Sequence, residues 1–201
     1  RAIGYLFLHP ITAASLVLSL MHGVGDKAAE AMQDILFDPL LSVAEAEKLG
    51  VRLVSLEELV AGSDVISLHA PSLPETQHMI GAAALARMKD GATLINTARG
   101  NIVSVPALVR ALAEGKLRAA GLDVLPQEPL VREEAEVFRG PPLEKENLEA
   151  LVANHVLLRF PNVIVTPHVA YNTHEAVARI IETTIENIEA FAMGSPKNLI
   201  V

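Results

Sequence analysis

The sequence predicts an α/β protein built on a doubly wound parallel sheet. From residue 51 onward, short runs rich in Val, Ile and Leu alternate with segments of helical periodicity, which is typical of consecutive βαβ units. Residues able to do chemistry directly follow several of the apolar runs. Open α/β sheets bind ligands beyond the carboxyl ends of their strands, so these positions also predict where a site would form.

The boundaries of the elements can be followed along the chain. Strands are predicted at residues 51–54, 64–69, 92–96, 119–124 and 163–166. Helices are predicted at residues 56–61 and 81–88, between Ser104 and Gly115, and from Asn172 to Gly194. The long acidic stretch 126–160, with helical patches at residues 132–138 and 148–158, is predicted to be an insertion that crosses over the sheet.

Capping signals support two of the helix starts. Ser55 and Glu58 are spaced as a capping box, and Asn172 and Glu175 show the same signal at the last helix. One face of that last helix is apolar and carries Val177, Ile180, Ile181, Thr184, Ile185, Ile188 and Phe191.

Composition excludes several classes of protein. The chain has 201 residues, 51% of them hydrophobic, and a formal net charge of −8, so it can bury a core and is too apolar to be disordered. Its scattered basic residues argue against a nucleic-acid or membrane surface and favour a small-molecule ligand. The apolar stretch 11–21 is about half of the ~20 residues that span a bilayer, so no membrane segment is expected. Because cysteine is absent, disulfides are excluded and a cytoplasmic location is expected.

Four segments place reactive side chains at the ends of apolar runs. They contain, in order, Arg99, Asp123, Glu128 and His168. A guanidinium offers a planar fork of donors to a carboxylate, and an imidazole near neutrality can give or take a proton. Each residue alone would fit an ordinary turn or strand end, but the ordered set predicts an active site.

These segments belong to a longer series of motifs. The series consists of Phe37-Asp38-Pro39, Ser67-Leu68-His69-Ala70-Pro71 with Pro74-Glu75-Thr76, Asn96-Thr97-Ala98-Arg99-Gly100, Gly121-Leu122-Asp123-Val124 and Thr166-Pro167-His168. From residue 36 to its C-terminus, the chain resembles the Rossmann-like nucleotide-binding domain of the NAD-dependent D-2-hydroxyacid dehydrogenases. Residues 126–160 and 168–173 are most similar to the D-lactate-dehydrogenase-like branch.

The resemblance implies catalytic roles for three residues. Arg99 would hold the carboxylate and carbonyl of the substrate, and His168 would be the general acid and base. Glu128 would hydrogen-bond the imidazole and raise its pKa. The hydride would come from nicotinamide, because a protein has none of its own. The implied activity is hydride transfer between NAD(H) and a D-2-hydroxy acid/2-oxo acid pair, in a homodimer.

The resemblance also implies a site for NAD. Asp38 matches the acidic residue that accepts hydrogen bonds from the adenine-ribose hydroxyls, and it would repel the 2′-phosphate of NADP. Asp123 matches the residue that orients the nicotinamide carboxamide. The residues that match the lining of the cofactor cleft are Ala70, Pro71, Thr76, Thr97 and Ala98. The histidine spacing matches no metal motif, so no metal is expected, and His69 is expected to pack at its strand end.

The N-terminal part departs from the family. A dinucleotide-binding unit opens with a strand, a Gly-x-Gly-x-x-Gly loop and a helix. The candidate loop at residues 23–28 ends ten residues before Asp38, which leaves only two or three helical turns between them. Alternatively, residues 12–33 resemble the helix that precedes the domain in this family, and the first strand, loop and helix are missing. We favour the second interpretation, with an apolar helical segment at residues 1–34, a remnant of an interdomain or dimerisation helix, and the NAD-binding domain at residues 35–201.

Two functions follow from this organisation. The first is a dehydrogenase chain that lacks most of the family's substrate domain, so the activity of the 201-residue form is an open question. The second is a non-catalytic NAD-binding or oligomerisation module derived from the same family.

Overall fold

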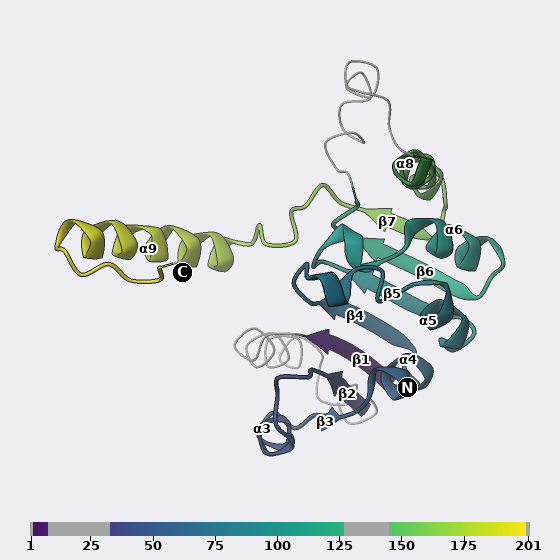
Figure 1. Ribbon diagram of the computed structural model, residues 1–201, viewed down its shortest axis with the longest axis horizontal. Helices are drawn as coiled ribbons and strands as arrows, with labels where there is room; N and C mark the ends of the chain where they lie inside the picture. Colours follow the sequence, from purple (N-terminus) through teal and green to yellow (C-terminus); the bar gives the residue numbers. More distant parts are fainter. Residues whose placement is uncertain (1, 8–32, 127–144, 200–201) are drawn as a thin grey trace. The chain divides into compact units, whose positions relative to one another are not determined.

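Seven strands of the described chain form one parallel sheet. The computed structural model describes residues 2–7, 33–126 and 145–199. The strands are β1 (Ala2–Phe7), β2 (Gln33–Phe37), β3 (Arg52–Leu53), β4 (Val65–His69), β5 (Ala92–Asn96), β6 (Leu117–Leu122) and β7 (Val163–Val165). Their order is β3-β2-β1-β4-β5-β6-β7 (Figure 1). The chain therefore winds in one direction from β1 to β3 and in the other from β4 to β7, which confirms the doubly wound sheet.

The first strand occupies the middle of the sheet. Strand β1 pairs in parallel with β2 and with β4, so that Tyr5 lies opposite both Leu36 and Ser67. The expectation that the first strand is missing is therefore wrong. The run Ile-Gly-Tyr-Leu-Phe has no alternation, as expected of a strand covered on both faces. The candidate loop at residues 23–28 lies outside the described residues.

The described α-helices lie between consecutive strands in the sequence, except α9, which follows the last strand. They are α3 (Val43–Lys48), α4 (Leu56–Gly62), α5 (Ala82–Arg87), α6 (Val105–Ala113), α8 (Lys145–Leu157) and α9 (His174–Ala192), with 3-10 turns at Pro74–Thr76 and Gly100–Ile102. Helices α4, α5, α6 and α8 contact one another in that order along the sheet (Figure 1). The predicted elements at residues 51–124 and 163–166 are confirmed to within about two residues, which is the usual uncertainty of element ends.

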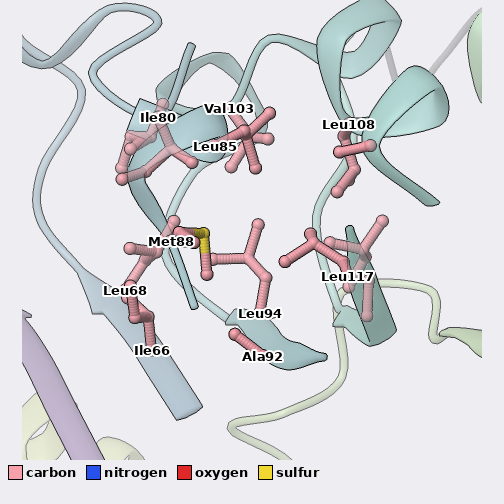
Figure 2. Packing of buried hydrophobic residues seen from close by; sticks show 14 of the residues in the cluster. Ile66, Leu68, Ile80, Leu85, Met88, Ala92, Leu94, Val103, Leu108 and Leu117 are labelled. Atoms are coloured by element: carbon pink, nitrogen blue, oxygen red, sulfur yellow. The ribbon is translucent and has the colours of Figure 1, made fainter. Parts of the chain in front are cut away.

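A single large apolar cluster joins the sheet to this row of helices. Figure 2 shows Ile66 and Leu68 of β4 and Leu94 of β5 gathered with Leu85 of α5 and Leu108 of α6. All five side chains are at most 2% exposed. Close packing of this kind makes the strands a rigid platform, because interior side chains have little room to shift.

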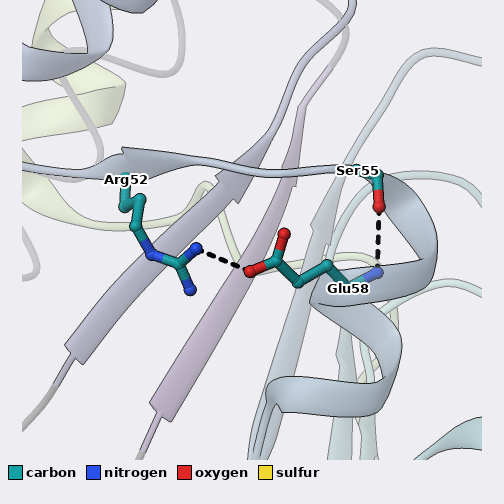
Figure 3. A network of polar contacts seen from close by, with 3 residues as sticks. All are labelled: Arg52, Ser55 and Glu58. Atoms are coloured by element: carbon teal, nitrogen blue, oxygen red, sulfur yellow. Dashed lines mark hydrogen bonds and ion pairs between the residues drawn. The ribbon is translucent and has the colours of Figure 1, made fainter.

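Two helix starts differ in detail from the capping prediction. At α4, the Ser55 hydroxyl accepts the Glu58 N–H at 3.1 Å, but the Glu58 carboxylate binds Arg52 at 2.6 Å (Figure 3). Only half of the expected capping box therefore forms. At α9, the N-cap is Thr173, whose hydroxyl accepts the Ala176 N–H at 3.2 Å, and the predicted cap at Asn172 is wrong.

Residues 168–201 form a second compact unit, separate from residues 1–167. Helix α9 ends at Ala192 and is followed by Gly194, whose φ is +73°, and the Ser195 N–H donates to the Ala190 carbonyl at 2.9 Å, as in a glycine-terminated helix. The predicted apolar face of α9 is exposed within this unit, and Phe191 is 75% exposed. In the described ranges, no helix combines the length and apolarity needed to cross a membrane.

Candidate functional site

The predicted cofactor residues of the first unit follow four different strands. Asp38 follows β2, Ala70 and Pro71 follow β4, the 97–99 segment follows β5, and Asp123 follows β6. Because all of these strands are parallel, their carboxyl ends lie along one edge of the sheet. The structure therefore places these predicted residues at the edge where doubly wound folds bind ligands.

Asp38 is a buried carboxylate with spare hydrogen-bonding capacity. The residue is 3% exposed, and its Oδ1 accepts the Leu40 N–H at 2.9 Å. Its Oδ2 is buried and has no hydrogen-bond partner among the described residues. A buried acceptor without a partner is costly, and a ligand hydroxyl would satisfy it. Asp38 therefore fits the ribose-binding position of a dinucleotide site.

The loop after β4 is held together by Thr76. The Thr76 side chain is fully buried, and its hydroxyl accepts the Leu73 N–H at 2.9 Å and lies 2.8 Å from the Pro71 carbonyl oxygen. Ala70 is also buried, and Pro71 is partly exposed. In the described structure, Thr76 thus braces the loop through its backbone groups.

His69 ends strand β4 and is neutral at physiological pH. Burial lowers the pKa of His69 from its usual 6.5 to about 4, because the charged imidazolium is poorly solvated there. Its Nε2 shares a hydrogen bond of 2.7 Å with the Ser67 hydroxyl. A histidine of this kind does not exchange protons near neutral pH, in keeping with the predicted packing role.

A buried asparagine shapes the turn that carries Arg99. The Asn96 side chain is 1% exposed, its Oδ1 accepts the Ala98 N–H at 3.0 Å, and its Nδ2 donates to the Arg99 carbonyl at 3.0 Å. Ala98 is buried and Thr97 is partly buried, whereas Arg99 is exposed. The Arg99 Nη1 donates to the Ala98 carbonyl at 2.7 Å. The other N–H groups of its planar fork can meet a carboxylate.

Asp123 links the ends of β5, β6 and β7. It is 5% exposed, its N–H donates to the Asn96 carbonyl at 2.9 Å, and its Oδ1 accepts the Thr166 hydroxyl at 2.5 Å. Thr166 comes directly after β7. The carboxylate therefore fixes the end of the last strand and faces the same sheet edge as the Arg99 turn.

The described structure does not place the three predicted catalytic residues relative to one another. Arg99 belongs to the first unit and His168 to the second, and Glu128 lies outside the described residues. His168 is exposed and has a φ of +57°, an uncommon backbone conformation for a residue with a side chain. Among the residues that the structure covers, no group of three or more His, Asp or Glu side chains is placed to hold a metal ion.

A doubly wound sheet with a buried acidic residue after its second strand defines a dinucleotide-binding domain. The model of the family described as "D-isomer specific 2-hydroxyacid dehydrogenase, NAD binding domain" matches residues 26–170. The chain belongs to this family, and the cofactor of its domain is NAD. The predicted resemblance and cofactor are thereby confirmed.

Curated relatives and solved structures agree with this assignment. Glycerate dehydrogenase of Methylorubrum extorquens is 41% identical over 148 residues, which are 74% of this chain and 41% of that protein. Glyoxylate reductase of Korarchaeum cryptofilum is 39% identical over 170 residues, which are 84% of this chain and 45% of that protein. The chain thus spans less than half the length of these two relatives.

The similar solved structures include D-lactate dehydrogenases. The enzyme from Aquifex aeolicus, complexed with NAD and lactic acid, is 34% identical with a TM-score of 0.72, covering 96% of this chain and 54% of that one. The enzyme from Treponema pallidum is 30% identical with a TM-score of 0.78, covering all of this chain and 56% of that one.

Sequence reasoning missed two asparagines that shape the site. Asn96 belongs to one of the predicted motifs, and an asparagine directly before a turn often bonds the backbone two residues on. Asn154, described below, carries no local signal, because its partner stands 28 residues away.

Proposed function

We propose that this chain transfers hydride between NAD(H) and a D-2-hydroxy acid/2-oxo acid pair, together with the part of the enzyme that its relatives carry beyond the matched region. The observation that carries the proposal is an exposed guanidinium, Arg99, on a buried turn at the same sheet edge as the unsatisfied carboxylate of Asp38. One residue would bind the anionic substrate and the other the cofactor.

The proposed chemistry divides between three side chains. When bound, NADH supplies a hydride to the carbonyl carbon of the 2-oxo acid. Arg99 would hold the substrate carboxylate and offset the negative charge that develops on the carbonyl oxygen. His168 would give that oxygen its proton, and Glu128 would orient the imidazole and favour its charged form.

The cofactor preference would follow from the environment of Asp38. Its buried carboxylate can accept hydrogen bonds from the two adenine-ribose hydroxyls, which satisfies Oδ2. The 2′-phosphate of NADP would meet a like charge there. Asp123, Ala70, Pro71, Thr97 and Ala98 would line the remainder of the cleft, with Thr76 bracing its loop.

NADH fluorescence titration and NADH oxidation with pyruvate, glyoxylate and hydroxypyruvate test this proposal. We expect NADH binding that weakens roughly tenfold or more in Asp38→Ala, and oxidation that is lost in Arg99→Met and His168→Asn without loss of NADH binding. A chain that binds no NADH would refute the proposal. NADH binding without turnover of any 2-oxo acid, even when the chain is joined to the part that its relatives carry beyond the matched region, would favour the alternative, a non-catalytic NAD-binding or oligomerisation module.

Sedimentation and cell fractionation address two further proposals. We propose a homodimer in the cytoplasm, in keeping with the absence of cysteine and the exposed apolar face of α9. A monomer at micromolar concentration would contradict the dimer.

A further inference from the structure

The turn that carries Arg99 is braced from two directions. We propose that Asn96, Gly100 and Asn154 are positioning residues that hold the Arg99 turn in place for the substrate carboxylate. This inference rests on the role proposed for Arg99.

Asn96 braces the turn from the strand below it. Its amide closes the turn at both ends, since Oδ1 accepts the Ala98 N–H and Nδ2 donates to the Arg99 carbonyl, each at 3.0 Å. The side chain is 1% exposed, so water does not compete for these bonds. The backbone that carries the guanidinium is therefore fixed to the end of β5.

Gly100 lets a second segment press against the turn. A Cβ placed on Gly100 would lie 2.2 Å from the Leu125 carbonyl carbon and 2.4 Å from the Pro126 nitrogen. The backbone that leaves β6 therefore packs directly on the residue that follows Arg99. No residue with a side chain could allow this approach without backbone movement.

Asn154 holds that second segment from the other side. It lies on α8, is completely buried, and its Nδ2 donates to the Pro126 carbonyl at 2.9 Å. Helix α8 is itself anchored by Leu157, which belongs to the main apolar cluster. A continuous series of contacts thus runs from α8 through Pro126 and Gly100 to Arg99.

The hydrogen bonding of Asn154 indicates that its amide is present to hold Pro126. Its Oδ1 is buried and has no hydrogen-bond partner among the described residues. A half-satisfied buried amide is less favourable than an apolar side chain of the same size. Leucine at this position would leave the Pro126 carbonyl without its donor, so the bond to Pro126 explains why an amide is present.

Fixing the backbone matters because the Arg99 side chain itself is exposed. A long exposed side chain has many rotamers. The backbone from which it extends therefore has to be fixed if the guanidinium is to meet a substrate carboxylate. A displacement of about 1 Å in a binding group can reduce activity by roughly 100-fold.

The test compares Asn96→Ala and Asn154→Leu with Asn162→Ala in the full chain. Asn162 is the matched control, because its Nδ2 also donates to a distant backbone carbonyl, that of Arg118, at 2.8 Å. The first readout is the NMR signal of the Arg99 Nε–H group in the free protein, identified by its loss in Arg99→Lys. The second is the Kd of oxamate, a 2-oxo acid analogue, in the presence of NADH.

We expect both test variants to shift the Arg99 signal and to weaken oxamate binding by roughly 10- to 100-fold. The NADH affinity should change much less, and the control should change neither readout. An Arg99 signal and an oxamate Kd that match the wild-type values in both variants would overturn the inference. If the wild-type chain binds neither NADH nor oxamate, the proposed function fails, and the Arg99 signal alone decides the positioning role.

Two conservative variants apply if a test variant does not fold. Asn96→Asp keeps the acceptor for the Ala98 N–H and loses the donor to the Arg99 carbonyl. Asn154→Asp keeps the shape of the side chain and loses the donor to Pro126. Each should shift the Arg99 signal, and an unchanged signal in both would overturn the inference.

Discussion

Replacing Gly100 by alanine would test the close approach between two backbone segments. The added Cβ would meet the Leu125 carbonyl carbon at 2.2 Å, the Pro126 nitrogen at 2.4 Å and the Leu125 carbonyl oxygen at 2.5 Å. Ordinary contact begins at 3.4 Å, so the backbone segments must separate by about 1.2 Å. All three obstacles are backbone atoms, and no side-chain rotation can relieve the clash.

The expected loss of stability can be placed at the upper end of the range for overpacking. Such substitutions cost about 1–3 kcal/mol, and we expect about 3 kcal/mol because the backbone must move. For a chain of this size, each kcal/mol lowers Tm by about 2–4 °C. The predicted decrease in Tm is therefore about 6–12 °C, measured by circular dichroism during heating and by urea unfolding.

Gly121→Ala is the matched control. It introduces the same methyl group on neighbouring strand β6, and a Cβ at Gly121 would meet no atom within 4 Å. We expect this variant to stay within about 0.5 kcal/mol of the wild-type free energy of unfolding. If Gly100→Ala were as stable as Gly121→Ala, the described packing of residues 125 and 126 against Gly100 would be refuted.

The structure also predicts the change in stability for three further sets of substitutions. Leu94→Ala, at a fully buried position, should cost about 2–5 kcal/mol, whereas Ile164→Ala, at a position 71% exposed, should cost well under 1 kcal/mol in the same urea titration. Because burial lowers the pKa of His69 to about 4, the unfolded chain binds this proton more readily than the folded chain. The wild type should thus lose up to about 3 kcal/mol as pH falls from 6.5 to 4, and His69→Gln should lose correspondingly less. Thr166→Val removes the donor to the buried Asp123 carboxylate and should cost about 1–3 kcal/mol, while Thr184→Val, which removes a bond on the exposed surface of α9, serves as its comparison.

Local pattern was sufficient to predict much of the sheet. Strand β5 was predicted with its observed bounds, Ala92–Asn96, because an apolar run there is bounded by Gly91 and by the polar Thr97. The Ser55 hydroxyl caps α4 as expected. The Glu58 carboxylate does not complete the capping box, because Arg52 on β3 competes for it. This competition depends on how β3 packs beside α4, which residue spacing alone does not predict.

The missed features depend on contacts between distant segments. Short helix α3 was not predicted, although Ser42 and Glu45 form a reciprocal capping box. Strand β1 was missed because its pattern gives no periodicity and its partners lie far along the chain. The strand-end positions of Asp38, Arg99 and Asp123 could be predicted from sequence, since each lies at or shortly after the end of an apolar run. The brace formed by Gly100 and Asn154 could not, because no local spacing encodes it.

The central position of β1 has a consequence for the order of folding. Its first residues pair with β2 about thirty residues later and with β4 about sixty residues later, as in the pairing of Ile3 with Val65. Closing loops of that length costs entropy before the contacts that repay it exist. We expect β4, β5 and β6, with the helices between them, to collapse first, and β1 to enter the sheet late. A ribosome-bound chain would then keep the gap between β2 and β4 open until much of the sheet had formed.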